Sequence, residues 1–221
     1  MNFIFMLTVG DRTIPDCLAV AETLRPLGLR HVGFKDIGVP FATLESLHAC
    51  LKSLGATTYL EVVSTSTETA IASAKAAAKL GVDKLLGGAD AGPILKAAPG
   101  ISCYPFAGRP EGHPTRLGGT PESVAEDCRR LEAMGASGVD MLAYRATEAD
   151  PIDLTKAARK ALKGELIVAG SIDSPDRIRA VRDAGADAFT IGTAAISGTF
   201  LPGRAGLPAQ LEAILDAVSR A

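Results

Sequence analysis

Residues 165–192, ELIVAGSIDSPDRIRAVRDAGADAFTIG, decide the fold. A short apolar run at 165–170 leads to Ser174, a good helix N-cap, and then to a proline at the first position of an amphipathic helix. Gly185 stands where a helix needs a left-handed C-terminal residue, and a second apolar run follows at 187–192. Short apolar runs on either side of a helix are typical of parallel strands buried on both faces. The stretch therefore predicts one strand–helix–strand unit of an α/β protein.

The same order of helix, glycine and apolar run recurs along the chain. The glycines in this position are Gly28, Gly55, Gly81, Gly135, Gly164 and Gly185. The pattern predicts strands near 3–9, 31–36, 57–63, 83–88, 101–106, 138–144, 165–170 and 187–192. It predicts helices near 14–27, 41–54, 66–80, 91–97, 121–134, 151–163, 175–184 and 206–220. The expected N-caps are Thr13, Thr65, Thr120, Asp150 and Ser174.

Eight alternating strand–helix units require parallel strands joined by helical crossovers. In a chain of 221 residues they favour a closed (β/α)8 TIM barrel, because single barrels commonly have about this length. A doubly wound open sheet is the alternative. No linker, low-complexity segment or block of charge divides the sequence, so we expect residues 1–221 to form a single barrel domain.

Composition narrows the class of protein. Hydrophobic residues make up 47% of the chain and charged residues 22%, which predicts a folded globular protein and excludes disorder. The formal net charge of −2 gives no basic field for nucleic acid, although a local cationic pocket for a small anion is compatible with it. The N-terminal apolar run Phe3–Val9 is far shorter than the roughly 20 residues that span a bilayer, and it lacks signal-peptide features. We therefore expect a small-molecule ligand and neither a nucleic-acid nor a membrane partner. A homo-oligomer is left open.

The four cysteines, Cys17, Cys50, Cys103 and Cys128, are scattered and form no C-x-x-C pair. Their spacing supports neither a disulfide framework nor a metal cluster. This pattern favours a reduced, cytoplasmic setting.

Charged residues interrupt two of the expected strands close to the strand ends, where (β/α)8 barrels carry their active sites. Lys35 lies in HVGFKDIG and Glu61 in TYLEVVS. We interpret them as an acid/base pair or as a Schiff-base lysine with a carboxylate partner, and a structural ion pair is the alternative. Asp36 is a further catalytic candidate, and Asp11 either takes part in catalysis or caps the first helix. Asp140, near the expected start of its strand, is interpreted as structural.

Small residues end the last two expected strands and predict a phosphate site. Gly170 and Ser171 follow the seventh strand, and Gly192 and Thr193 follow the eighth. Small residues let backbone N–H groups approach an anion closely, and barrels often bind phosphate with this pair of loops and a short extra helix. Residues 196–199 are the candidate for that helix. The alternative is that these glycines only form tight strand–helix turns.

The segment Gly108–Gly119, GRPEGHPTRLGG, is the longest strand-to-helix connection. It carries Arg109, His113 and Arg116 among glycines and prolines. We interpret it as a lid that brings cations over an anionic substrate, and a solvated loop is the alternative.

Tyr144 and Arg145 follow the sixth expected strand and are candidate substrate-binding residues. No H-x-H, H-E-x-x-H or acidic cluster points to a metal, and a site on Glu61, Asp90 or His113 would have no spacing in its favour. We therefore expect no metal and no cofactor.

Residues 167–196, IVAGSIDSPDRIRAVRDAGADAFTIGTAAI, resemble the closing third of the ribulose-phosphate-binding barrels. That superfamily includes isomerases of histidine and tryptophan synthesis, phosphosugar epimerases and a 3-keto-gulonate-6-phosphate decarboxylase. The resemblance implies a barrel fold and phosphate contacts at Gly170, Ser171, Gly192 and Thr193. The decarboxylase pattern D-x-K-x-x-D is absent around Lys35, which disfavours that activity.

A shorter segment, GFKDIG at 33–38, resembles the second strand of the archaeal formylfuran-methyl-phosphate synthases. The resemblance implies a Schiff-base role for Lys35. Gly33 stands where that family has an acidic residue.

Together these features predict an enzyme that acts on a small phosphorylated carbonyl compound, such as a sugar phosphate. The expected reaction is isomerisation or epimerisation by proton transfer, with Lys35 and Glu61 as the acid/base candidates. A class I aldolase or synthase with Lys35 as the Schiff base is the first alternative. A non-catalytic barrel that binds a phosphometabolite is the second.

Overall fold

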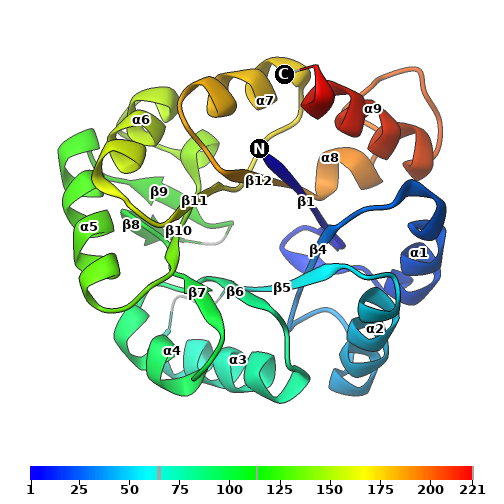
Figure 1. Ribbon diagram of the computed structural model, residues 1–221, viewed down its shortest axis with the longest axis horizontal. Coiled ribbons are helices and arrows are strands. Elements are labelled where there is room, and N and C mark those ends of the chain that lie inside the picture. The colour runs from blue at the N-terminus through cyan, green and yellow to red at the C-terminus, as the bar shows by residue number, and fades with distance from the viewer. Residues whose placement is uncertain (64–65, 113, 221) are drawn as a thin grey trace.

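The computed structural model describes residues 1–63, 66–112 and 114–220. Thr65 and His113, an expected N-cap and a candidate substrate-binding residue, lie outside the described residues. Eight parallel strands form a ring, with helices on its outside (Figure 1). The strands are β1 (Asn2–Met6), β4 (His31–Lys35), β5 (Thr57–Val62), β6 (Lys84–Gly87), β7 (Ser102–Tyr104), β10 (Gly138–Met141), β11 (Glu165–Val168) and β12 (Ala188–Ile191).

The strand order β10-β11-β12-β1-β4-β5-β6-β7 runs around the ring, and backbone contacts between its two ends close it. Phe106, just after β7, forms a parallel bridge with Asp140 of β10. The Asp140 N–H donates to Pro105 O at 3.0 Å, and the Ala107 N–H donates to Asp140 O at 3.0 Å. A closed (β/α)8 barrel is therefore confirmed, and the doubly wound open sheet is excluded.

Helices connect the strands at nearly the expected positions. They are α1 (Cys17–Thr23), α2 (Phe41–Ser53), α3 (Thr67–Leu80), α4 (Ala91–Ala97), α5 (Pro121–Ala133), α6 (Pro151–Ala161), α7 (Pro175–Asp183), α8 (Thr193–Ile196) and α9 (Leu207–Ser219). The side chains of Thr120, Asp150 and Ser174 cap their helices as expected. The short extra helix is present as α8, but it begins at Thr193 rather than at residue 196.

The segment after β1 differs most from the expectation. The first helix covers only Cys17–Thr23 and is followed by a 3-10 turn at Arg25–Leu27. Before it, β2 (Thr8–Val9) and β3 (Arg12–Thr13) form a hairpin whose turn residues, Gly10 and Asp11, both have positive φ. Thr13 is therefore not an N-cap, because its hydroxyl is bonded to the backbone of Lys35. Two positive-φ residues between short strands are typical of a type I′ turn.

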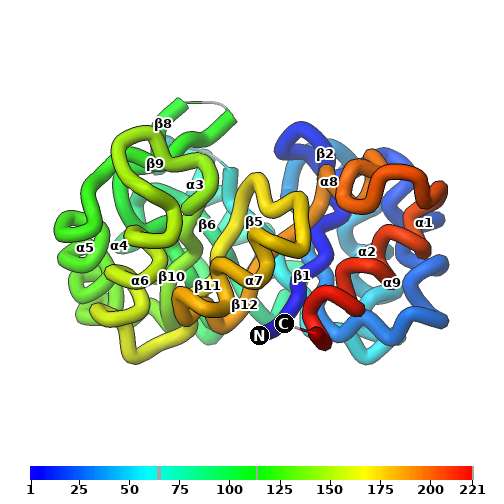
Figure 2. The backbone as a smooth tube through the Cα atoms, turned by 90° about the horizontal axis from the view of Figure 1, so that it is seen from above, coloured from blue at the N-terminus to red at the C-terminus, as the bar shows by residue number. Residues whose placement is uncertain are grey.

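A second hairpin lies within the long segment after β7. Strands β8 (Arg109–Glu111) and β9 (Arg116–Gly118) pair antiparallel, so this connection is partly ordered into sheet. In Figure 2, β8 and β2 lie at the rim of the barrel opposite the N-terminus. Both hairpins therefore stand at the end where the barrel strands terminate.

The barrel interior is built from alternate residues of each strand. Ile4, Tyr59, Tyr104 and Ile167, contributed by alternate strands, belong to one inner apolar cluster. The strand registers and the stagger of an eight-stranded barrel identify the next layer of inward-facing residues, which lies closer to the strand ends. This layer consists of Gly33, Leu86, Asp140 and Thr190. The interior is thus packed below and becomes polar toward the rim.

The four cysteines are free thiols. No helix in the described part of the chain has the length and apolar character needed to cross a bilayer.

Candidate active site at the barrel mouth

Lys35 and Glu61 meet at the mouth because they are direct partners on neighbouring strands. Lys35 is the last residue of β4 and is 2% exposed, and Glu61 on β5 is also buried. The Lys35 Nζ lies 3.4 Å from Glu61 Oε2 and 2.7 Å from Asp11 Oδ1. Buried charges need partners of this kind, so the ammonium of Lys35 is a charge-assisted donor held between two carboxylates.

The hairpin β2–β3 positions Asp11 and fixes Lys35. The Thr13 hydroxyl donates to Lys35 O at 2.7 Å and accepts from the Lys35 N–H at 2.8 Å. Burial opposes ionisation of Asp11, but the charges of Lys35 and Arg145 outweigh that effect and hold its pKa below the usual range. Asp11 therefore belongs to the site, and it does not cap the first helix, whose N-cap is Asp16.

Asp36 is directed away from the mouth. Because it follows Lys35 directly, its side chain projects to the other face of the barrel wall. It accepts a 2.5 Å hydrogen bond from Ser73 of α3. The structure therefore separates this predicted catalytic residue from Lys35, Asp11 and Glu61.

Arg145 links the charged residues to the predicted phosphate loops. Its Nη1 lies 3.4 Å from Asp11 Oδ2 and 3.4 Å from Thr115 O. Its side chain covers Gly170, where a Cβ would stand only 2.8 Å from Arg145 Nε. Tyr144, in contrast, stacks against the Arg177 guanidinium at 4.6 Å. Only Arg145 of this predicted pair joins the charged cluster.

The predicted phosphate residues border two neighbouring cavities. An inner cavity of about 60 Å³ is lined by Met6, Thr8, Asp11, Lys35, Glu61, Leu142, Arg145, Ala169, Gly170, Thr190, Gly192 and Thr193. An outer cavity of about 490 Å³ is lined by Pro114, Thr115, Arg116, Arg145, Ala146, Thr147 and Ser171. Arg145 lines both cavities and stands between them. The inner cavity has room for only about two water molecules, so a sugar phosphate would have to move this side chain.

Two backbone features suit the approach of an anion. Gly170 and Ser171 both have positive φ, +77° and +56°. A Cβ at Gly192 would lie 2.9 Å from the carbonyl oxygens of Met6 and Thr8, so a larger residue does not fit. Gly192 precedes α8, and the first N–H groups of a helix have no acceptor within the helix.

Arg109 does not face the mouth. It forms ion pairs with Glu111 and Glu148, and Glu148 also accepts a 3.0 Å hydrogen bond from the Gly119 N–H. These contacts stabilise the β8–β9 hairpin on its outer side. Arg116 lines the outer cavity and is the cation that this segment places beside the site.

Asp140 was interpreted as structural from the sequence, and the structure places it next to the charged cluster. It is 0% exposed, and neither carboxylate oxygen has a hydrogen-bond partner among the described residues. Burial and the nearby charge of Glu61 raise its pKa well above the usual value, against the opposing effects of Lys35, Arg145 and the adjacent Met141 N–H, which lies outside hydrogen-bond geometry. In SGVDMLAY an acid interrupts an apolar strand as Glu61 does, but the sequence does not show how far along the barrel this acid lies.

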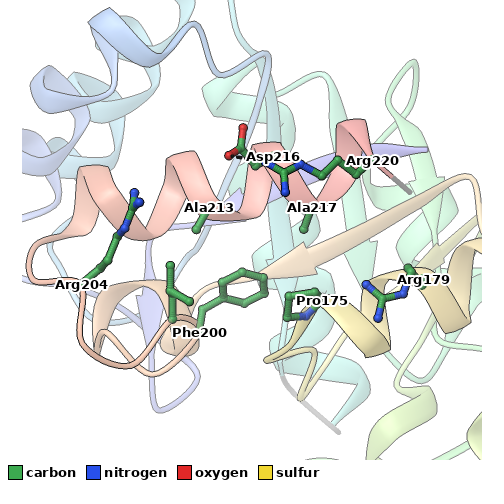
Figure 3. Close-up of a pocket in the computed structure, with 9 residues that line it drawn as sticks. Pro175, Arg179, Phe200, Arg204, Ala213, Asp216, Ala217 and Arg220 are labelled. Atoms are coloured by element: carbon green, nitrogen blue, oxygen red, sulfur yellow. Dashed lines mark ion pairs between the residues drawn. The ribbon is translucent and has the colours of Figure 1, made fainter.

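A groove of about 330 Å³ lies outside the barrel between α7 and α9. Figure 3 shows Phe200 against Ala213 and Ala217 of α9, with arginines at the edges of the groove. Arg179 pairs with Asp176, and Arg220 lies 3.6 Å from Asp216. Although this groove is larger than the inner cavity, its cations do not converge on one point, so we place the site at the barrel mouth. No group of three or more His, Cys, Asp or Glu side chains suited to a metal occurs in the described part of the chain.

The comparisons with known proteins agree with the fold. No protein-family model and no curated sequence matches the chain. Solved structures do match it, among them a native KDPGal structure with a TM-score of 0.69 and 14% identity, which covers 100% of this chain and 95% of that one. Orotidine 5′-phosphate decarboxylase from Pyrococcus horikoshii OT3 has a TM-score of 0.63 and 13% identity over 98% of this chain and 99% of that one.

A tryptophan synthase α-subunit from Pyrococcus furiosus has a TM-score of 0.63 and 16% identity over 97% of this chain and 98% of that one. Identities this low show the fold alone. The matches therefore support the (β/α)8 architecture of the chain and no more than that.

Proposed function

We propose that the protein is an enzyme that moves a proton on a carbon next to the carbonyl group of a small phosphorylated compound. The observation that carries this proposal is the buried Lys35 ammonium, held 2.7 Å from Asp11 and 3.4 Å from Glu61 at the C-terminal end of the barrel. Beside it are the small residues at the ends of β11 and β12. The fold is shared with orotidine 5′-phosphate decarboxylase, whose name contains a phosphate ester, and this supports a phosphorylated substrate.

The phosphate is assigned to the loops that contain Gly170, Ser171, Gly192 and Thr193. Their small side chains leave the backbone accessible, and Thr193 and Ser171 add hydroxyl donors. Arg145 would exchange its long contacts with Asp11 and Thr115 for the phosphate, because a dianion is the stronger partner for a guanidinium. Binding energy from the phosphate would then hold the reacting carbon in place.

The reaction that best suits the charges is isomerisation or epimerisation through an enediol or enolate. Glu61 removes the proton from carbon, and Lys35 stabilises the negative charge that develops on the carbonyl oxygen. In an isomerisation Glu61 then returns the proton to the neighbouring carbon, whereas in an epimerisation a second acid must protonate the opposite face of the same carbon. Asp11 holds the Lys35 ammonium in position throughout.

A Schiff-base mechanism is the second candidate, and one observation favours it. Lys35 is buried at a strand end with two carboxylates within 3.4 Å, either of which could take the proton that the amine must lose before it attacks a carbonyl.

Dihydroxyacetone phosphate in D2O tests the proposal and separates the two mechanisms. We expect the enzyme to exchange a carbon-bound hydrogen next to the carbonyl for deuterium, measured by proton NMR, and to give no adduct with borohydride. A borohydride-trapped adduct on Lys35, found by mass spectrometry, would favour the Schiff-base enzyme instead. If the protein bound members of a panel of phosphorylated ketoses and aldoses but exchanged no hydrogen in any of them, it would be a non-catalytic barrel that binds a phosphometabolite.

A further inference from the structure

Asp140 is a buried carboxyl group that the proposed mechanism leaves without a task. Both of its backbone groups are hydrogen-bonded, because its N–H donates to Pro105 O and its carbonyl accepts from the Ala107 N–H where the barrel closes. Its side chain is 0% exposed, yet neither oxygen has a hydrogen-bond partner among the described residues. Buried polar side chains in native proteins are nearly always paired, so an exception needs an explanation.

The strand registers place this side chain inside the barrel at the floor of the mouth. Asp140 is the direct partner of Ile167 on β11, and Ile167 belongs to the inner apolar cluster. The same registers put Asp140 in one layer with Thr190, which lines the inner cavity. Barrels usually fill such a layer with branched apolar residues, and a carboxyl group here has lost its water without gaining a partner.

The charges around Asp140 explain how it is tolerated. Lys35 and Arg145 are balanced by Asp11 and Glu61, so one further carboxylate would leave the cluster with an uncompensated negative charge. Burial and the charge of Glu61 raise the pKa of Asp140 well above its usual value. Protonation of Asp140 keeps the charges of the cluster balanced, and the protonated side chain then has one O–H to donate and no acceptor among the described residues.

The geometry points to Asp140 as a further catalytic residue, the acid that protonates the carbonyl oxygen of the substrate from the barrel layer beneath the inner cavity, the layer that it shares with the lining residue Thr190. This inference rests on the proposed function. Lys35 approaches the same oxygen from the rim and stabilises its charge, whereas Asp140 supplies the proton from below. The missing partner of the Asp140 side chain is then the substrate itself.

The step balances without a further reagent. Glu61 takes a proton from carbon, the electron pair of that C–H bond forms the C=C bond, and the carbonyl oxygen takes the proton of Asp140. The enzyme then holds a neutral enediol, a protonated Glu61 and an ionised Asp140, which Lys35 and Arg145 help to balance. In the reverse direction the enediol O–H returns its proton to Asp140 as Glu61 reprotonates carbon.

Two substitutions at Asp140 separate a catalytic from a structural role. Asp140→Asn keeps the size and removes the transferable proton, and Asp140→Leu fills the layer with an apolar side chain. We expect either change to lower deuterium exchange into dihydroxyacetone phosphate by about 100-fold or more. We also expect Asp140→Leu to raise Tm, because it removes an unpaired buried carboxyl group. Leu86→Met, a volume-conserving change in the same layer, is the control and should keep the wild-type rate.

The outcomes distinguish this inference from the proposed function. Exchange by the wild type that survives within threefold in Asp140→Asn would overturn the role of Asp140 and leave the proposed function intact. A lower Tm in both Asp140 variants, with exchange falling only as the folded fraction falls, would make Asp140 structural. No exchange by the wild type would overturn the proposed function, and with it the role of Asp140. A loss of exchange with unchanged or raised Tm supports the inference.

Discussion

The barrel interior contains one polar cluster at each end, and the two are built differently. The lower cluster, at the starts of the strands, consists of His31, Tyr59, Lys84, Tyr104 and Glu165. Lys84 Nζ lies 2.5 Å from Glu165 Oε2 and over the rings of Tyr59 and Tyr104 at 5.5 and 5.0 Å. The Tyr59 hydroxyl is 2.9 Å from His31 Nδ1. Burial, followed by the charge of Glu165, raises the pKa of Tyr59, so this hydroxyl stays neutral.

The mouth cluster, made of Asp11, Lys35, Glu61, Asp140 and Arg145, is less completely satisfied. Two of its ion pairs are 3.4 Å long, and both Asp140 oxygens lack partners among the described residues. The lower cluster closes the barrel with short contacts, whereas the mouth cluster leaves donors and charges available to a ligand. A lysine at the end of the barrel interior therefore does not by itself indicate catalysis, because what matters is whether the hydrogen-bonding and ion-pairing groups around it are already paired with one another.

Matched substitutions of Lys35, which is buried, and Lys84, which is half-buried, give the largest expected contrast. Lys35→Met should lower the exchange rate by about 1000-fold or more and change Tm little, since Arg145 still faces Asp11. Lys84→Met should destabilise the protein by about 2–3 kcal/mol, because Glu165 loses its partner, and the folded fraction should keep its rate. Activity and thermal unfolding are measured on the same samples. If Lys35→Met instead lowers the free energy of unfolding by about 3–5 kcal/mol and leaves the exchange rate of the folded protein unchanged, the ion pair of Lys35 and Glu61 is structural.

Asp11→Asn tests how the mouth cluster responds to pH. The pKa of Asp11 lies below its unfolded value of 3.8, so its ionised form contributes stability above that pH. This contribution is lost as the pH falls through the lowered pKa. We expect wild-type Tm to fall more steeply than that of the variant below about pH 4, and exchange at neutral pH to drop about 10–100-fold. If Tm of the wild type and of the variant fell equally with decreasing pH, the ion pair between Asp11 and Lys35 would add no stability.

The phosphate loops allow an opposed pair of changes at one residue. Ser171→Glu should abolish binding of dihydroxyacetone phosphate in calorimetry, because it places an anion against an anion. Ser171→Gly should bind and be at least as stable as the wild type, since glycine adopts the +56° φ at less cost. Equal binding by wild type and Ser171→Glu would show that the phosphate group binds elsewhere in the mouth.

The β8–β9 hairpin should give the smallest effects. Arg116→Ala is expected to weaken ligand binding a few-fold, because Arg116 lines the outer cavity. Arg109→Ala should change neither binding nor Tm appreciably, because its ion pairs are exposed. A loss of affinity in Arg109→Ala alone would restore the lid interpretation of this residue.

The repeated glycines and apolar runs predict the barrel well, because each strand–helix unit carries its own local signals. The pairing of Lys35 with Glu61 followed from two charges at equivalent strand ends. Asp36 was grouped with Lys35 in the sequence, but the structure directs its side chain to Ser73 because one step along a strand reverses the side-chain direction. The turn at Gly10 and Asp11 was missed, although two such residues between short extended segments are a hairpin signal.

Asp140 and Arg109 show where the sequence carries too little information. The strand that contains Asp140 begins at Gly138, two residues before it, and only the stagger between strands sets the height of a residue in the barrel. Arg109 lies in a segment whose ion partners, Glu111 and Glu148, depend on how the hairpin folds back. Contacts between segments far apart in the sequence decide both cases.

The double hydrogen bond between Thr13 and Lys35 has a consequence for related sequences. Asp11 and Thr13 precede Lys35 by 24 and 22 positions, yet the three residues act as one unit through side chain and backbone. A chain that replaces Lys35 has no reason to retain the other two. Among homologues the three positions should therefore co-vary, and the pattern D-x-T followed by K at this spacing is a search signature for chains that share the site.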